Sequence, residues 1–171
     1  MLREPRPEQL TSALLRNPGA LDGQRADCDA GLPTVLIDLD PADGLFAPDR
    51  VSRADQALVE QLATLRKQGI SVAWISGHSA DGAGKVRRAL SLSGLDLRNE
   101  DALLLMRYPG DRKQTRRREL AETRCVLAIA GDTRADFDEL YDYIRDTSAA
   151  AQLENLLGNG WFLTPLAFTQ D

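Results

Sequence analysis

The sequence contains no long hydrophobic run. None of its apolar stretches approaches the roughly 20 residues that a helix needs to cross a bilayer. Residues 1–8, which read M-L-R-E-P-R-P-E, lack the apolar core of a secretory signal peptide. We therefore expect no membrane association and a cytoplasmic location.

The chain is also poor in cysteine and carries no excess of positive charge. Cys28 lies in a polar segment and Cys125 begins an apolar run, and these unrelated contexts do not indicate a structural disulfide. The formal net charge of −5 disfavours a protein that binds nucleic acid regardless of sequence, although it leaves room for a local basic patch.

What the chain does contain is the composition of one globular domain. Apolar residues make up 43% and charged residues 27% of its 171 residues, which suits a single core. We expect an N-terminal arm, residues 1–33, packed on a core that comprises residues 34–171. Leucines at helical spacing predict a short helix over Glu8–Arg16 in the arm.

Apolar runs alternate with helical patterns along the rest of the chain. Strands are predicted at Thr34–Ile37, Ile70–Ile75, Ala102–Met106, Cys125–Ala130 and Trp161–Leu163. Helices are predicted from a capping box at Ser52 and Asp55 to Gly69, and at Lys85–Ser93, Asp111–Thr123, Phe137 to Asp146, and Ala149–Leu157. This alternation predicts an α/β fold with a mainly parallel sheet flanked by helices.

Polar side chains follow three of the predicted strands. Asp38 and Asp40 follow the first, Ser76 the second, and Asp132 and Asp136 the fourth. In open parallel sheets the functional site lies beyond the carboxyl ends of the strands, so we expect these groups to converge. Two acids one residue apart repel each other, and a cation or a shared proton is their natural partner.

These residue types suit the chemistry of phosphate esters. Asp38 and Asp132 are candidate ligands for Mg²⁺, which prefers carboxylate, water and phosphate oxygens. One carboxylate can then attack phosphorus while a second acid protonates the leaving oxygen. Ser76 offers a hydroxyl donor, and Lys113 offers an ammonium group that binds phosphate and keeps the nucleophile ionised.

In this order the residues resemble the motifs of the haloacid dehalogenase (HAD) superfamily of phosphohydrolases, over about Thr34 to Asp146. The resemblance implies a Rossmann-like HAD fold in which Asp38 forms a phosphoaspartyl intermediate and Asp40 is the general acid and base. It assigns the second motif to Ser76 and the third to Lys113. It also implies that the backbone carbonyl of Asp40 completes the metal shell.

The fourth motif is G-D-T-R-A-D, whose acids Asp132 and Asp136 would support Mg²⁺. The metal set expected from the resemblance is therefore Asp38, Asp40, Asp132 and Asp136. Substrate phosphate is expected to be bound by Ser76, Gly77, His78 and Lys113.

Two subgroups of the superfamily compete. Class C acid phosphatases, bacterial nucleotidases acting on phosphomonoesters, are similar in D-L-D-P-A-D, R-K-Q-T-R-R-R-E-L, G-D-T-R-A-D-F and N-G-W-F-L-T-P. The phosphatase domain of polynucleotide kinase-phosphatases, which removes 3′-phosphates from nucleic-acid ends, is similar in I-S-G-H and L-M-R-Y-P-G-D-R-K. The fourth motif favours the first. The expected substrate is thus a phosphorylated small molecule or nucleotide, with a phosphorylated nucleic-acid end as the alternative.

The sequence also departs from the family pattern. Pro41 and Ala42 follow the first motif where a hydroxyl donor is usual, and His78 stands where arginine is common. A catalytically weak module that binds phosphate or a partner is therefore a further hypothesis. The connections after the first two strands are too short for a cap domain, which predicts an open site, and they lack the insertion that helps class C enzymes hold the nucleobase.

Several features have two interpretations. His78 either assists at the phosphate or is a loop residue, and Arg116–Arg118 either steer an anionic polymer or form a solvated helix face. Tyr108 and Trp161 either stack on a base or pack in the fold, whereas Trp74 is expected in the core. Asp136 is either a metal-site residue or the N-cap of a helix that begins near Phe137.

Overall fold

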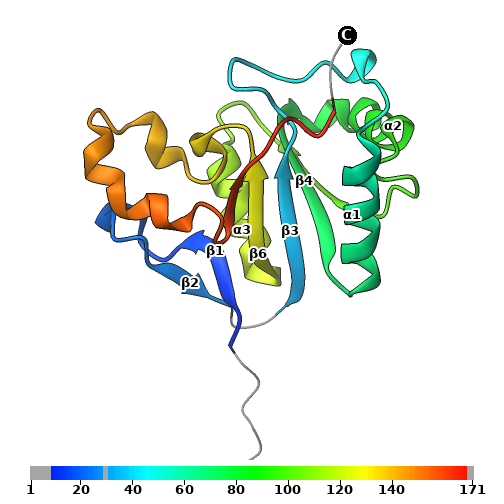
Figure 1. Cartoon of the computed structure of the whole chain (residues 1–171). Helices are drawn as coiled ribbons and strands as arrows, with labels where there is room; N and C mark the ends of the chain where they lie inside the picture. Colours follow the sequence, from blue (N-terminus) through cyan, green and yellow to red (C-terminus); the bar gives the residue numbers. More distant parts are fainter. Residues whose placement is uncertain (1–8, 29–30, 169–171) are drawn as a thin grey trace, which may run out of the picture.

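A five-stranded parallel sheet is the centre of the fold (Figure 1). The computed structural model describes residues 9–28 and 31–168. The strand order is β5-β4-β3-β6-β7, and each neighbouring pair is parallel. The strands are β3 (Leu32–Asp38), β4 (Ser71–Ser79), β5 (Ala102–Met106), β6 (Arg124–Gly131) and β7 (Trp161–Leu163). The predicted α/β fold with a mainly parallel sheet is therefore confirmed.

Helices cover both faces of this sheet (Figure 1). The α-helices are α1 (Gln56–Lys67), α2 (Ala83–Ser93) and α3 (Lys113–Thr123). Leu62 of α1 and Val86 of α2 pack in one core cluster with Trp74, whereas Leu120 of α3 packs in a second cluster with Ile75. Because side chains alternate along a strand, adjacent residues of β4 serve opposite faces.

The same alternation places the first acid. Along β3, Ile37 belongs to the core cluster under α1 and α2, and Leu36 belongs to the cluster under α3. Asp38 is two residues beyond Leu36 and therefore lies on the side of α3, whose first residue is Lys113. The carboxylate of Asp38 and the ammonium group of Lys113 therefore meet, because one ends β3 and the other begins α3.

Three secondary-structure predictions were wrong. The described part of Glu8–Arg16 contains a strand, β1 (Thr11–Leu15), because Ala13 is buried against the second core cluster. The segment predicted as a helix from Phe137 to Asp146 contains only a short 3-10 turn at Glu139–Asp142, after another at Arg134–Asp136. A helical segment does lie at Thr147–Leu156, close to the predicted Ala149–Leu157, but it is a 3-10 helix. The first long helix begins after Asp55, whose side chain accepts the Ala57 N–H, and not at Ser52.

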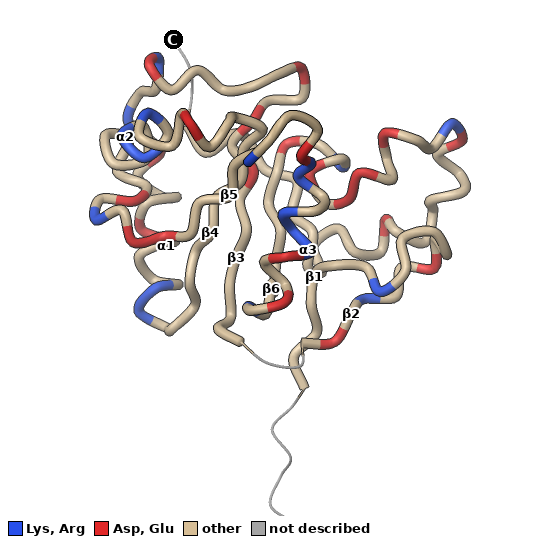
Figure 2. Tube along the Cα trace, turned by 180° about the vertical axis from the view of Figure 1, so that it is seen from behind, with Lys and Arg blue, Asp and Glu red and all other residues tan. Residues whose placement is uncertain are grey.

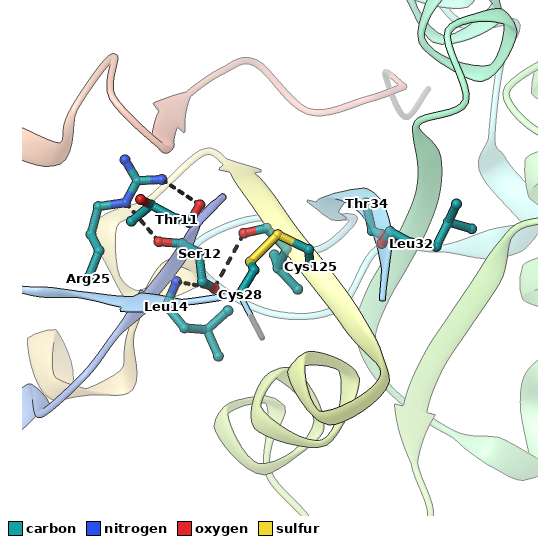
Figure 3. The surroundings of a disulfide bond; sticks show 9 residues. Thr11, Ser12, Leu14, Arg25, Cys28, Leu32, Thr34 and Cys125 are labelled. Carbon is teal, nitrogen blue, oxygen red and sulfur yellow. Dashed lines mark hydrogen bonds between the residues drawn. A yellow bond between two sulfur atoms is a disulfide. The ribbon is translucent and has the colours of Figure 1, made fainter. Parts of the chain in front are cut away.

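β1 pairs with β2 (Arg25–Asp27) in a small antiparallel sheet that is attached to β6 (Figure 3). A disulfide joins Cys28 to Cys125, with their Cα atoms 5.3 Å apart, and corrects the expectation that no structural disulfide is present. The indole Nε1 of Trp161 also donates to the Ala13 carbonyl over 2.8 Å. The hairpin is therefore fixed to the central sheet by a covalent bond and by hydrogen bonds.

The connections at the carboxyl edge of the sheet are short. Between β3 and α1 the only helical element is a 3-10 turn at Pro48–Arg50, and another turn, Ala80–Gly82, precedes α2. Neither connection holds a separate domain, as the sequence predicted. Within residues 9–28 and 31–168, no helix combines the length and the apolar character needed to cross a membrane.

Candidate active site

Lys113 joins the two acids that follow the central strand. Its Nζ lies 2.9 Å from Oδ1 and 2.9 Å from Oδ2 of Asp38, and 2.8 Å from Oδ2 of Asp40. Both carboxylates are buried, with exposed fractions of 2% and 3%. The backbone N–H of Asp40 also donates to Oδ1 of Asp38 over 2.9 Å. Lys113 therefore provides the cation that the adjacent acids require.

Asp40 accepts hydrogen bonds from four donors. Its Oδ1 accepts from the Ser76 hydroxyl at 2.9 Å and from the Phe46 N–H at 3.2 Å. Its Oδ2 accepts from the Gly77 N–H at 2.7 Å and interacts with Lys113. Two lone pairs on each oxygen are thereby used. In this arrangement Asp40 is held in place by four contacts, and it must release one donor before it can carry a proton.

The groups predicted to bind phosphate are directed at protein atoms here. Ser76 Oγ donates to Asp40 and accepts from the His78 N–H, and the Gly77 N–H donates to Asp40. His78 Nε2 lies 2.6 Å from the Phe46 carbonyl oxygen, and the two rings meet edge to face. His78 therefore contacts the loop after β3, and a substrate must compete with Asp40 for Ser76 and Gly77.

The two acids of the fourth motif lie side by side after β6. Oδ2 of Asp136 accepts the Thr133 N–H over 3.1 Å in a capping box at the 3-10 turn. Asp136 is thus the third residue of that turn rather than the N-cap of a helix near Phe137. A Cβ at Gly131 would lie only 2.5 Å from the Asp136 Cβ, so this approach requires glycine.

Burial perturbs the acids of the site. Desolvation raises the pKa of Asp38, although the charge of Lys113 and hydrogen bonds to Asp40 and Lys113 act in the opposite direction. Desolvation also raises the pKa of Asp132 and of Asp136. The neighbouring Asp136 raises the pKa of Asp132 further, and the charge of Asp38 raises that of Asp136. Burial by itself lowers the pKa of Lys113. The charges and hydrogen bonds of Asp38 and Asp40 outweigh burial, so the pKa of Lys113 is raised.

The acids offer oxygen ligands to a divalent cation. In the part of the chain that the structure describes, no group of three or more Asp, Glu, His or Cys side chains is arranged to hold a metal ion. Mg²⁺ nevertheless takes only one or two carboxylates and completes its shell with water and phosphate oxygens. The buried Oδ1 of Asp132 has no hydrogen-bond partner among the described residues, so it is available as such a ligand. The donor set therefore fits Mg²⁺.

Helix α3 contributes residues that the sequence analysis did not select. Gln114 is buried, and its amide donates to Asp138 and accepts from Arg117 and from the Glu139 N–H. Arg117 is only 1% exposed, which corrects both expectations for this residue, whereas Arg118 is exposed. The sequence offered one signal for Arg117. It lies four residues after Lys113 and three after Gln114, and residues at these spacings share a helix face.

Two hollows adjoin the buried acids. One, of about 320 Å³, is lined by Lys113 and Arg117 of α3, by Pro41, and by Asp136 and Glu139. The second, of about 460 Å³, is lined by Gly77, Arg107 and Tyr108 among others. Figure 2 shows Lys and Arg at α3 next to acidic segments.

The two aromatic candidates for base stacking differ in exposure. Tyr108 is 56% exposed, with the Arg107 guanidinium 5.6 Å from its ring centroid. Trp161 is fully buried and stacks on Phe137, so it packs in the core, as Trp74 does. Only Tyr108 is therefore placed to meet a ligand.

Solved structures with a similar fold include a class C acid phosphatase from Bacillus anthracis. Its structure with tungstate bound matches with a TM-score of 0.57, and a second structure with 0.58. Both are 14% identical in sequence and cover 81% of this chain and 68% of the other. This likeness shows that the chain shares the fold of these class C acid phosphatase structures. No family model and no curated protein matches the sequence.

A chain in the structure of the Pnkp1/Rnl/Hen1 RNA repair complex also matches. The TM-score is 0.50 at 18% identity, and the match covers 96% of this chain. It covers 48% of that chain, so the present chain spans about half the length of this neighbour.

Proposed function

We propose that the chain is a Mg²⁺-dependent phosphomonoester hydrolase that acts through an aspartyl phosphate on Asp38, like an acid phosphatase or nucleotidase. The observation that carries this proposal is the contact of one ammonium group, Lys113 Nζ, with Asp38 and Asp40 at the carboxyl edge of a HAD-like sheet. The order of the motifs and the similarity to class C acid phosphatases support it.

In the first step an oxygen of Asp38 attacks phosphorus. A bond forms between that oxygen and phosphorus while the bond from phosphorus to the ester oxygen breaks. Asp40 gives a proton to the leaving oxygen. To carry that proton, its carboxyl group must first release one of the four donors that it now contacts. Lys113 keeps Asp38 ionised and stabilises the charge on the transferring phosphoryl group.

In the second step water attacks the same phosphorus. Asp40, now ionised, accepts a proton from this water, and the bond between phosphorus and Asp38 breaks. Phosphate leaves, Asp38 is regenerated as a carboxylate, and Asp40 again holds a proton. The N–H of Gly77 and the hydroxyl of Ser76 become available to phosphate whenever Asp40 releases them.

Mg²⁺ would be held by one or two of the carboxylates of Asp38, Asp132 and Asp136, together with the backbone carbonyl of Asp40. When bound, it supplies positive charge that offsets the acids and the phosphate oxygens. The unpaired Oδ1 of Asp132, as judged within the described residues, supports this assignment.

Hydrolysis of an aryl phosphate tests the proposal. We expect activity that requires Mg²⁺ and that is abolished in Asp38→Asn. In Asp132→Asn, half-maximal activity should need a higher Mg²⁺ concentration, because the metal is bound more weakly. Full activity in Asp38→Asn would exclude the mechanism. Arg118→Gln, on the exposed side of α3, is the matched control and should retain activity.

Asp40→Asn tests the acid and base role separately. With an activated aryl ester, which needs little help from an acid, this variant should form the acyl phosphate but hydrolyse it slowly. Rapid quenching and mass measurement should show one added phosphoryl group per chain. Complete absence of the adduct during turnover would count against this role for Asp40.

The hollow beside Gly77 favours a second candidate, a phosphatase acting on nucleic-acid ends. Exposed Tyr108 and Arg107 offer a stacking surface and a cation beside the buried acids. A 3′-phosphorylated oligonucleotide should then be hydrolysed faster than a free mononucleotide, and Tyr108→Ala should remove the difference. Equal rates would leave the small-molecule hydrolase.

The third hypothesis, a catalytically weak module, predicts binding without turnover. Ser76 and Gly77 are both directed at Asp40, which is the arrangement that such a module would retain. Calorimetry that detects Mg²⁺ and phosphate binding, with no hydrolysis across a broad panel of phosphomonoesters, would select this hypothesis over the first.

A further inference from the structure

Arg117 is a buried cation with unused hydrogen-bond donors. Its side chain is 1% exposed, and its Nη2 donates to Oε1 of Gln114 over 2.7 Å. Its Nε and Nη1 have no hydrogen-bond partner in the described part of the chain, and no ion pair joins it to a carboxylate there. A guanidinium group without a carboxylate partner is costly to bury.

Gln114 fixes the direction of this guanidinium group. Its Nε2 donates to Oδ2 of Asp138, and its Oε1 accepts both from Arg117 and from the Glu139 N–H. The amide cannot rotate without losing these bonds, because its donor and acceptor ends are not interchangeable. Arg117 is thereby kept beside Lys113, on the wall of the hollow of about 320 Å³.

The charges around this hollow explain what Arg117 adds. Lys113 is shared by two carboxylates, Asp38 and Asp40, so these three groups together keep one negative charge. Asp38 is the first of the acids whose charge acts on Arg117, ahead of Asp138 and Asp136. Arg117 adds a second cation, beside Lys113, to a hollow whose wall also carries the acids Asp136 and Glu139. Without Arg117, an arriving phosphate dianion meets a more negative site.

We propose that Arg117 is the charge-balancing residue of an oxyanion site in this hollow, and that it allows phosphate to bind beside the buried acids Asp38 and Asp40. The inference rests on the proposed function, because it assigns a residue to that same site. Arg117 acts through its charge, which is weakly screened because the side chain is buried. Lys113 offsets the charge of the two carboxylates, and Arg117 offsets the charge of the incoming anion.

The experiment compares Arg117→Met with the wild type by calorimetry with inorganic phosphate and with tungstate, in the presence of Mg²⁺. We expect affinity to fall on the order of tenfold or more, and by a similar factor at about 50 mM and about 500 mM salt, because a buried charge is little screened. Thermal stability should stay the same or rise, because methionine fills similar volume without an unpaired charge.

Arg118→Met is the matched control, because Arg118 is an exposed neighbour on the same helix. It should leave oxyanion affinity within about twofold at high salt, where an exposed charge is screened. Arg117→Lys restores the charge and should recover part of the affinity, and it also serves if the methionine variant does not fold.

Outcomes separate this inference from the proposed function. Unchanged oxyanion affinity in Arg117→Met, or equal losses in Arg117→Lys and Arg117→Met, would overturn the charge-balancing role. A wild type that binds neither phosphate nor tungstate would also overturn it. If the wild type binds these anions through Arg117 but hydrolyses no phosphomonoester, the proposed function fails and the oxyanion site stands. In a hydrolysing enzyme, Arg117→Met should raise KM more than it lowers kcat.

Discussion

At the scale of single residues, Phe46 connects His78 to Asp40. Its N–H donates to Asp40, its carbonyl oxygen lies 2.6 Å from His78 Nε2, and its buried ring contacts the rings of His78 and Phe168. His78 therefore contacts the same loop residue that donates to Asp40. We expect the only histidine of the chain to influence Asp40 through this residue.

Replacement of His78 by alanine should affect leaving groups unequally. Alkyl phosphates need a proton on the leaving oxygen, so their hydrolysis should fall about tenfold more than that of an aryl phosphate with a good leaving group. The measurement is kcat/KM across a series of leaving groups. Phe46→Leu keeps both backbone contacts and should show a smaller difference, whereas equal losses for all esters in His78→Ala would assign His78 to stability alone.

At the scale of elements, the end of β6 meets the turn that carries Asp136. Gly131 is the last residue of this strand, and any side chain there would overlap the Asp136 side chain. The strand and the turn are therefore packed as closely as backbone and carboxylate allow. That packing brings Asp136 toward Asp132 and within the field of Asp38.

Gly131→Ala should destabilise the fold by about 1–3 kcal/mol, because the added methyl group overpacks this contact. It should also reduce activity, because Asp136 must move. Urea denaturation measures the first effect. Gly84→Ala is the control: a Cβ there has no neighbour within 4 Å, and the position lies in α2, so a small gain of stability up to about 1 kcal/mol is expected. Equal effects of both substitutions would contradict the steric argument.

At the scale of the whole molecule, the N-terminal hairpin is covalently tied to the sheet. The disulfide spans 97 residues, from Cys28 beside β2 to Cys125 in β6. Such bonds persist in oxidising compartments and are rare in the cytosol. The expected cytoplasmic location therefore stays a prediction, and the redox state of these cysteines is a direct test of it.

Reduction of this disulfide should lower the free energy of unfolding by about 2–5 kcal/mol, as is typical when a long loop is released. Unfolding in urea with and without reductant measures the difference in the wild type. Cys28→Ser should unfold at the lower midpoint in both conditions. Detection of two free thiols in the denatured, unreduced wild type would show that the bond is not formed.

The local sequence pattern was sufficient to predict the central sheet and the edge of the sheet at which the acids lie. Apolar runs of strand length and helices between them specify parallel strands, and the residues after β3 and β6 must then lie at one edge. Asp38, Asp40 and Lys113 meet as predicted, because the alternation along β3 and the start of α3 place them there. Their catalytic roles and the Mg²⁺ site remain proposals.

Tertiary packing decided the rest. The segment around Ala13 is a strand because it lies against β6, and Cys28 finds Cys125 for the same reason, which no local periodicity encodes. The arginine run is one charged segment in the sequence, yet only packing determines that Arg117 is buried while Arg118 is exposed. Hydrophobic periodicity and strand order determine where side chains can meet. The bonding partner of a side chain and its burial depend on contacts between residues far apart in the chain.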